Sequence, residues 1–190
     1  MDGKLRNMTS LYLTDDTGIL CLYRIGSRVA DKMYIGSAGG HFEKEELNDA
    51  RACVLREARE ELGIEEKDIP DMKLRYITLR LINGEIRQNY YFFARRPQGL
   101  ELTSTEGRLE HIRYEDIPDL KMPSSAKHMI LHYLQEGRYT DTVYAGVSVA
   151  WGAHFAPFGE IDDSDKSAAC ESKRRVVCSV SGHSVREVQQ

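Results

Sequence analysis

The chain has 190 residues, enough for one domain with a sizeable core, and its 41% hydrophobic and 29% charged residues are ordinary for a globular protein. Its 26 Lys and Arg against 30 Asp and Glu give a net charge of −4, which argues against broad electrostatic binding to nucleic acid or to an anionic membrane surface. The net charge does not exclude a small phosphorylated substrate, because a few local cations or a metal ion suffice to bind one.

The cysteines and the N-terminus indicate the compartment. The four cysteines form no CxxC pair, and no apolar run follows the charged N-terminus. No stretch approaches the roughly 18 apolar residues of a membrane span. We therefore expect a reduced, cytoplasmic protein with free thiols and no signal peptide.

The first expected elements are three short strands. Residues 8–13 and 19–24 are apolar runs separated by Asp15-Asp16-Thr17-Gly18, a sequence typical of a hairpin turn. Residues 34–38 form the third candidate strand, which ends at Gly39-Gly40.

A helix is expected next. Asn48 or Asp49 is suited to cap its N-terminus, and its pattern runs to Leu62, where Gly63 favours termination.

The second half of the chain continues with strands and one more helix. Asn83-Gly84 is a strong hairpin signal between the strand candidates 74–82 and 86–94. After a polar loop, the expected elements are a strand 109–113, a helix 126–134 capped by Ser124 or Ser125 and ended by Gly137, and extended segments 143–149 and 153–158. This order predicts an α/β fold with a mixed sheet and helices packed on its faces.

Composition sets the expected domain boundary. From residue 162 onward Asp, Ser, Lys and Arg replace large apolar residues. We therefore expect one domain over residues 1–161 and a tail over 162–190 with at most one short strand, Val176–Val180.

The expected helix before Gly63 carries carboxylates in an unusual place. On a helical wheel an apolar stripe is formed by Ala50, Val54, Leu55, Ala58 and Leu62. Glu57 and Glu61 fall inside or at the edge of this stripe, and Glu60 lies beside it. Burying an unpaired carboxylate costs several kcal/mol, so the arrangement favours a site for Mg²⁺ or Mn²⁺. A solvated acidic helix whose glutamates pair with its own arginines, such as Arg56 with Glu60, is equally compatible with the spacing alone.

The same segment resembles the signature of the Nudix hydrolase family (MutT-like). Gly40 and Glu46 match its first part, and Arg56-Glu57-Ala58-Arg59-Glu60-Glu61-Leu62-Gly63-Ile64 matches its second part at every fixed position. The nine residues between Glu46 and Arg56 are two more than is common, and Ala38 stands where proline is frequent. The resemblance covers roughly residues 8–136. It implies the Nudix fold, an α/β/α sandwich with a mixed β-sheet.

The resemblance also implies roles for individual residues. Metal ligands would be Glu57, Glu60, Glu61 and the backbone carbonyl of Gly39. The base that accepts a proton from water would be one of Glu60, Glu61 and Glu106.

Supporting roles fall to other side chains. We expect Arg56 to pair with Glu46 and so hold the loop against the helix, unless it only pairs with Glu60 on the surface. Arg24 and Arg28 are candidates for substrate phosphates, although a solvated basic loop is the alternative reading.

The function implied is Mg²⁺-dependent hydrolysis of a diphosphate linkage in a nucleoside diphosphate derivative, with oxidised nucleoside triphosphates among the candidate substrates. The expected partner is thus a small nucleotide-like molecule, without nucleic acid or membrane, and a homodimer is compatible with the family. A noncatalytic nucleotide sensor on the same fold is the main alternative, which the intact glutamates disfavour. Isomerase chemistry on an isopentenyl diphosphate is a third, but neither Cys21 nor Cys53 is obviously placed for it.

Overall fold

A computed structural model describes residues 4–26, 30–149 and 151–159 of the chain. Residues up to Phe158 form one compact unit. The expected tail with its strand Val176–Val180 lies outside the described residues, as does Arg28. The domain boundary at residue 161 therefore stays a prediction.

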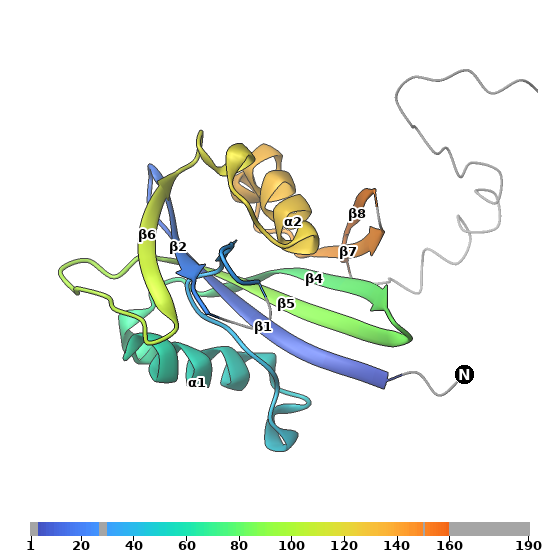
Figure 1. Cartoon of the computed structure of the whole chain (residues 1–190), viewed down its shortest axis with the longest axis horizontal. Coiled ribbons are helices and arrows are strands. Elements are labelled where there is room, and N and C mark those ends of the chain that lie inside the picture. The colour runs from blue at the N-terminus through green and yellow to red at the C-terminus, as the bar shows by residue number, and fades with distance from the viewer. Residues whose placement is uncertain (1–3, 27–29, 150, 160–190) are drawn as a thin grey trace, which may run out of the picture. The chain divides into compact units, whose positions relative to one another are not determined.

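The described residues form strands, two α-helices and four single-turn 3-10 helices (Figure 1). The strands are β1 (Lys4–Thr14), β2 (Gly18–Arg24), β3 (Tyr34–Ile35), β4 (Lys73–Ile82), β5 (Glu85–Arg95), β6 (Gly107–Arg113), β7 (Tyr144–Val149) and β8 (Gly152–Pro157). The helices are α1 (Ala50–Leu62) and α2 (Ser124–Gln135), with η1 (Lys44–Glu46), η2 (Glu66–Asp68), η3 (Ile117–Asp119) and η4 (Gly137–Tyr139). No helix among the described residues is long and apolar enough to span a membrane.

All strands among the described residues belong to one sheet of mixed direction. Its order is β3-β2-β1-β5-β4-β7-β8, and β6 pairs with β2 outside this path. The β1/β5 and β4/β7 pairs are parallel, whereas the hairpins β1/β2, β4/β5 and β7/β8 are antiparallel. The predicted mixed sheet is confirmed.

The two α-helices pack on opposite faces of this sheet (Figure 1). Strand residues alternate between the faces, as the two-residue period of a strand requires. On β1, Leu11 and Leu13 join the apolar cluster under α1, whereas Tyr12 between them joins the cluster under α2. The predicted α/β/α sandwich is thus confirmed.

Turn and capping residues act largely as the sequence indicates. The Asp49 carboxylate accepts a 2.9 Å hydrogen bond from the N–H of Ala52 and caps α1. Gly63 ends the helix with a φ of 68°, in the left-handed region that glycine tolerates best. Asn83 and Gly84 both take positive φ values, 51° and 75°, and close the β4/β5 hairpin.

The predicted serine cap of the second helix is wrong. Pro123 is the N-cap, and its carbonyl accepts the first helical hydrogen bond, from the N–H of Lys127 at 2.9 Å. The helix begins at Ser124, so both serines lie in its first turn, and it ends at Gln135, before Gly137. Proline has a fixed φ and no N–H to satisfy, so it suits the start of a helix.

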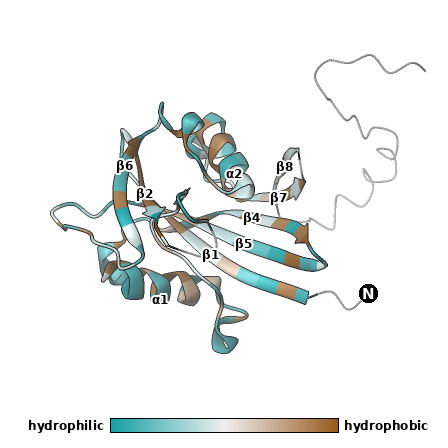
Figure 2. Cartoon of the chain, viewed as in Figure 1, coloured by the Kyte–Doolittle hydropathy of each residue, from teal (hydrophilic) through white to brown (hydrophobic). Residues whose placement is uncertain are grey.

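Two strand lengths also differ from expectation. β1 begins at Lys4 rather than at residue 8, because it pairs with β5 along its whole length and this pairing includes polar residues. In Figure 2 the polar and apolar colours alternate along β1, β4 and β5 toward the β4/β5 turn. β3 is shorter than expected because the residues after Ile35 leave β2 and run along the edge of β1 instead.

Candidate active site

The glycine loop lies directly against β1. The N–H groups of Thr9 and Leu11 donate to the carbonyls of Gly40 and Ala38 at 2.9 and 2.8 Å. Gly39 has a φ of 149°, and a Cβ there would overlap the carbonyl oxygen of Thr9. A Cβ on Gly40 would overlap the Glu57 carboxylate. Two consecutive glycines therefore let the backbone approach both the strand and the acidic helix.

Helix α1 presents two glutamates to this loop. The backbone N–H of Gly39 donates to Oε2 of Glu61 at 2.9 Å, which ties the loop to the helix. Loop, helix and the segment before β6 together enclose a pocket of about 440 Å³. Its lining consists of Met8, Arg24, Gly39, Gly40, His41, Phe42, Glu43, Arg56, Glu57, Glu61 and Glu106.

Arg56 joins the loop to the helix through several contacts. Its Nε lies 2.8 Å from Glu46, and its Nη1 lies 3.0 Å from both Glu57 and Glu60. Its Nη2 donates to the carbonyl of His41 at 3.0 Å. Both contacts considered for Arg56 from the sequence, to Glu46 and to Glu60, are therefore present. Hydrogen bonds from Arg56 hold the pKa of Glu46 down to about 2.

The pocket gathers Glu57, Glu61 and Glu106 but not Glu60. The Glu60 side chain is 56% exposed, pairs with Arg56 and is not part of the lining. Glu106, from the loop before β6, interacts directly with Glu61 and forms an ion pair with Arg24. Two distant parts of the chain, α1 and the loop before β6, thus bring these carboxylates to one place.

The pKa values of Glu57 and Glu61 are raised. Burial raises the pKa of Glu61 to about 8, and the neighbouring Glu106 and Glu57 carboxylates add to the effect, against the hydrogen bond from Gly39. Burial also raises the pKa of Glu57, although Arg56 opposes this. Among the described residues, no three Asp, Glu, His or Cys side chains already surround a common point as metal ligands. The pocket lining contains four glutamates against two arginines, Arg24 and Arg56.

Arg24 is the expected phosphate contact that the structure places in this pocket. It reaches the pocket from the end of β2, and its guanidinium pairs with Glu106. Its Nε is buried and has no hydrogen-bond partner within the described part of the chain. The ion pair restrains the Glu106 side chain, and it also places a cationic side chain in the pocket lining.

Sequence reasoning missed part of the lining. His41, Phe42 and Glu43 directly follow the two glycines, so their closeness to the motif was an available signal. Met8 gave no such signal, because it reaches the pocket only through the pairing of β1 with the loop at His41.

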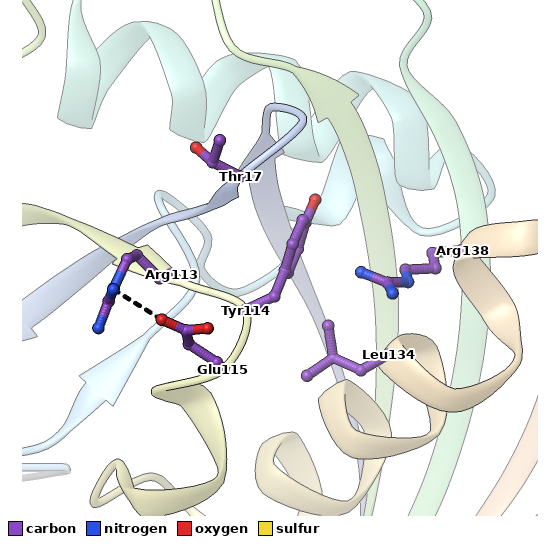
Figure 3. A pocket seen from close by; sticks show the side chains of 6 residues that line it. All are labelled: Thr17, Arg113, Tyr114, Glu115, Leu134 and Arg138. Carbon is purple, nitrogen blue, oxygen red and sulfur yellow. Dashed lines mark ion pairs between the residues drawn. The ribbon is translucent and has the colours of Figure 1, made fainter.

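A second pocket, of about 550 Å³, lies elsewhere and contains none of the expected site residues (Figure 3). It is lined by Thr17, Arg113, Tyr114, Glu115, Leu134 and Arg138. Arg113 and Glu115 pair at 2.6 Å, and the Arg138 guanidinium lies 5.0 Å from the centre of the Tyr114 ring. Its charges are thus already paired or stacked, and Glu115 is the one carboxylate among the described residues of its lining.

Comparison with solved structures shows the same fold. A mutator MutT protein from Bacillus halodurans is 22% identical with a TM-score of 0.60, covering 82% of this chain and 99% of its own. A MutT Nudix hydrolase from Burkholderia pseudomallei is 21% identical with a TM-score of 0.56, covering 67% of this chain and 97% of its own. A MutT protein from Methanosarcina mazei Go1 is 13% identical with a TM-score of 0.60, covering 74% and 99%.

Sequence comparison assigns the family. Among curated proteins no sequence matches this chain. The family model of the NUDIX domain matches residues 4–133, more than half of the chain, and this range contains the glycine loop, α1 and the segment before β6. The chain therefore belongs to the Nudix family and is a Nudix hydrolase.

Proposed function

We propose that this hydrolase cleaves a diphosphate linkage in a nucleoside diphosphate derivative with the help of Mg²⁺ or Mn²⁺. Nucleoside triphosphates, oxidised ones included, are the first substrates to test, and residues 1–161 would carry the activity. The observation that supports the proposal most is the gathering of Glu57, Glu61 and Glu106 in one pocket whose glutamates outnumber its arginines.

The chemistry of the donor set fits a hard dication. Carboxylate oxygens and a backbone carbonyl are the ligands that Mg²⁺ prefers. Glu57, Glu61 and the carbonyl of Gly39 would hold the ion, and Glu60 would join them only by giving up its contact with Arg56. A bound dication neutralises charge on the diphosphate oxygens and lowers the pKa of a coordinated water.

The protein's own groups would orient the reaction. Arg56 fixes Glu57 from one side and the loop carbonyl of His41 from the other, which keeps the helix and loop at a constant separation. Glu61 is held by the N–H of Gly39. These contacts limit the rotamers that the pocket carboxylates adopt, which favours one orientation for substrate binding.

A carboxylate beside the diphosphate must accept the proton of the attacking water. Glu61 and Glu106 both line the pocket, whereas the Glu60 side chain contacts Arg56. The ion pair with Arg24 holds the Glu106 carboxylate at the pocket wall. We therefore assign the proton to the Glu61–Glu106 pair rather than to Glu60.

The test is a panel of nucleoside triphosphates, dinucleotides and nucleotide sugars, assayed for phosphate or nucleotide release with Mg²⁺ and with EDTA. Glu106→Gln is expected to lower kcat by about 100-fold or more, as removal of a general base does. Glu45→Gln, which removes an exposed carboxylate outside the pocket, serves as the control. Absence of turnover for every compound, together with tight binding of one of them, would instead support a noncatalytic nucleotide sensor.

A further inference from the structure

Three arginines stand side by side on neighbouring strands. The sheet register pairs Arg6 on β1 with Arg87 on β5, and Arg87 with Arg80 on β4. Residues opposite one another in a sheet project from the same face, and like charges there repel each other. Nη1 of Arg80 donates to the Ser125 hydroxyl at 3.1 Å, so this is the face that α2 covers. We call Arg6, Arg87 and Arg80 the arginine row.

The arginine row has too little negative charge around it. Glu85 is shared by two of its members, with contacts of 2.9 Å to Arg6 and 2.7 Å to Arg87. Arg80 takes part in no ion pair among the described residues, and burial and Arg87 both lower its pKa. A half-buried guanidinium whose side-chain partner is one hydroxyl is costly to keep in place without an anion.

A cavity of about 360 Å³ opens beside Arg80. Ser124 and Ser125, in the first turn of α2, line it together with Ser148 of β7. Three further lining residues, Leu81, Ile82 and Val149, are apolar. The hydroxyl of Ser148 is buried without a hydrogen-bond partner within the described part of the chain.

The start of α2 adds to the positive potential in this cavity. The first helical hydrogen bond there is the one from the N–H of Lys127, so the preceding N–H groups of the first turn have no partner within the helix. Free N–H groups and the helix dipole favour an anion at this end. The cavity lining thus offers a guanidinium and serine hydroxyls beside the first turn of α2, and these are usual ligands of a phosphate.

The arginine row also reaches the catalytic pocket. Nη1 of Arg6 lies 3.5 Å from Nε2 of His41, which lines that pocket. Adjacent strands are about 4.8 Å apart, so the row spans about 10 Å between the Cα atoms of Arg6 and Arg80. A ligand with two anionic groups about this far apart would contact both ends of the row.

We propose that the arginine row and the cavity beside Arg80 bind a second, phosphate-class anionic group of the substrate, distinct from the diphosphate that is cleaved. The assignment to the substrate rests on the proposed function. The anion site itself does not, because its arginines and serines lie apart from Glu57, Glu61 and Glu106.

The first experiment measures anion binding without catalysis. Pyrophosphate is titrated calorimetrically into the full-length protein in EDTA at low ionic strength. Arg80→Gln is expected to weaken binding about tenfold, the usual effect of losing a charge-assisted hydrogen bond. Ser148→Ala is expected to weaken it severalfold. Arg95→Gln, which removes an exposed arginine paired with Asp16, is the matched control and should bind as the wild type does.

The same variants provide a second readout, thermal unfolding without and with pyrophosphate. Removing Arg80 relieves repulsion within the row, so Arg80→Gln is expected to raise the Tm of the anion-free protein and to abolish most of its Tm increase with pyrophosphate. Equal pyrophosphate affinity in the wild type and in Arg80→Gln would refute the anion site, as would the absence of binding to the wild type.

The second experiment asks whether the bound anion belongs to the substrate. Pyrophosphate is titrated into protein saturated with adenosine 5′-diphosphate or with the same nucleotide carrying an extra 3′-phosphate, and then with each nucleotide of the panel. Displacement of pyrophosphate by a nucleotide with a second anionic group supports the proposal. Simultaneous binding of pyrophosphate with every nucleotide contradicts it and indicates a separate anion. A protein without hydrolase activity would refute the proposed function, yet leave Arg80-dependent pyrophosphate binding intact.

Discussion

Replacing Glu61 with Gln keeps an oxygen that accepts the N–H of Gly39 but removes a carboxylate that the metal-free pocket disfavours. The folded protein holds the pKa of this group near 8 instead of 4.5, so it retains a proton that the unfolded chain releases. The stability of the metal-free wild type should therefore fall as pH rises from about 4.5 to about 8. Glu61→Gln carries no such penalty, so the two proteins should diverge across this window.

The size of the effect follows from the two pKa values. Their difference corresponds to a ceiling of about 5 kcal/mol at pH 8. Solvent screening of a group that is only partly buried reduces this to about 2 kcal/mol. For a domain of this size that amounts to a Tm about 4–8 °C higher for Glu61→Gln at pH 8.

The assay is thermal unfolding in EDTA at pH 5, 6.5 and 8, with hydrolysis measured in parallel. We expect equal Tm values at pH 5, a higher Tm for Glu61→Gln at pH 8, and loss of most of its hydrolytic activity. Glu45→Gln, an exposed carboxylate, should follow the wild type at each pH. A Tm difference between Glu61→Gln and the wild type that is constant with pH would refute the reasoning from burial.

Further predictions concern the metal, the arginine and the glycine loop. Adding Mg²⁺ after EDTA should raise the Tm of the wild type, more at pH 8 than at pH 6, because the ion replaces protons on the pocket carboxylates; an unchanged Tm contradicts the site. Arg56→Lys should lower the free energy of unfolding by about 2 kcal/mol at pH 7, because lysine does not reproduce the forked contacts to Glu46. In urea titrations this loss should shrink as pH falls from about 4.5 towards 2, where Glu46 takes up its proton and its stabilising contribution disappears. Gly40→Ala should lower kcat about 100-fold or more with a smaller effect on Tm, because its methyl group displaces Glu57.

Two matched variants control for these changes. Arg51→Lys alters an exposed arginine of the same helix that pairs with Glu66, and it should leave stability nearly unchanged. Gly152→Ala adds a methyl group where no atom lies within 4 Å, and its kcat should remain that of the wild type. An Arg56→Lys protein as stable as Arg51→Lys would show that the contacts to Glu46 contribute little.

Local sequence signals predicted the elements whose structure depends on nearby residues. Asp49 and Gly63 bound α1 because a carboxylate at the N-cap and a glycine in the left-handed region act within one helical turn. Asn83-Gly84 likewise closes its hairpin through its own φ values. The predicted serine cap was wrong because the neighbouring Pro123 is the N-cap of α2, and its fixed φ and missing N–H suit the start of a helix.

The candidate site was harder to predict because its charged side chains have several possible ion-pair partners. The helical wheel places Glu57, Glu60 and Glu61 within one arc, but it does not say that Arg56 draws Glu60 to the surface. The arrival of Glu106 beside Glu61 depends on the path of a distant loop. The arginine row could not be found at all without the register between β1, β5 and β4, because its members are far apart in the sequence.

The parallel pairing of β1 with β5 also bears on how the chain folds. Lys4 opposes Glu85, so each contact between β1 and β5 closes a loop of about 80 residues. The β4/β5 hairpin, in contrast, is closed by a turn of two residues. Non-local pairing of this kind is associated with high contact order and slow folding. We expect the β4/β5 hairpin to form early and to serve as the template on which β1 docks. Because the glycine loop is hydrogen-bonded to β1, the candidate active-site pocket would acquire its shape only after β1 has paired with β5, a strand made much later during synthesis.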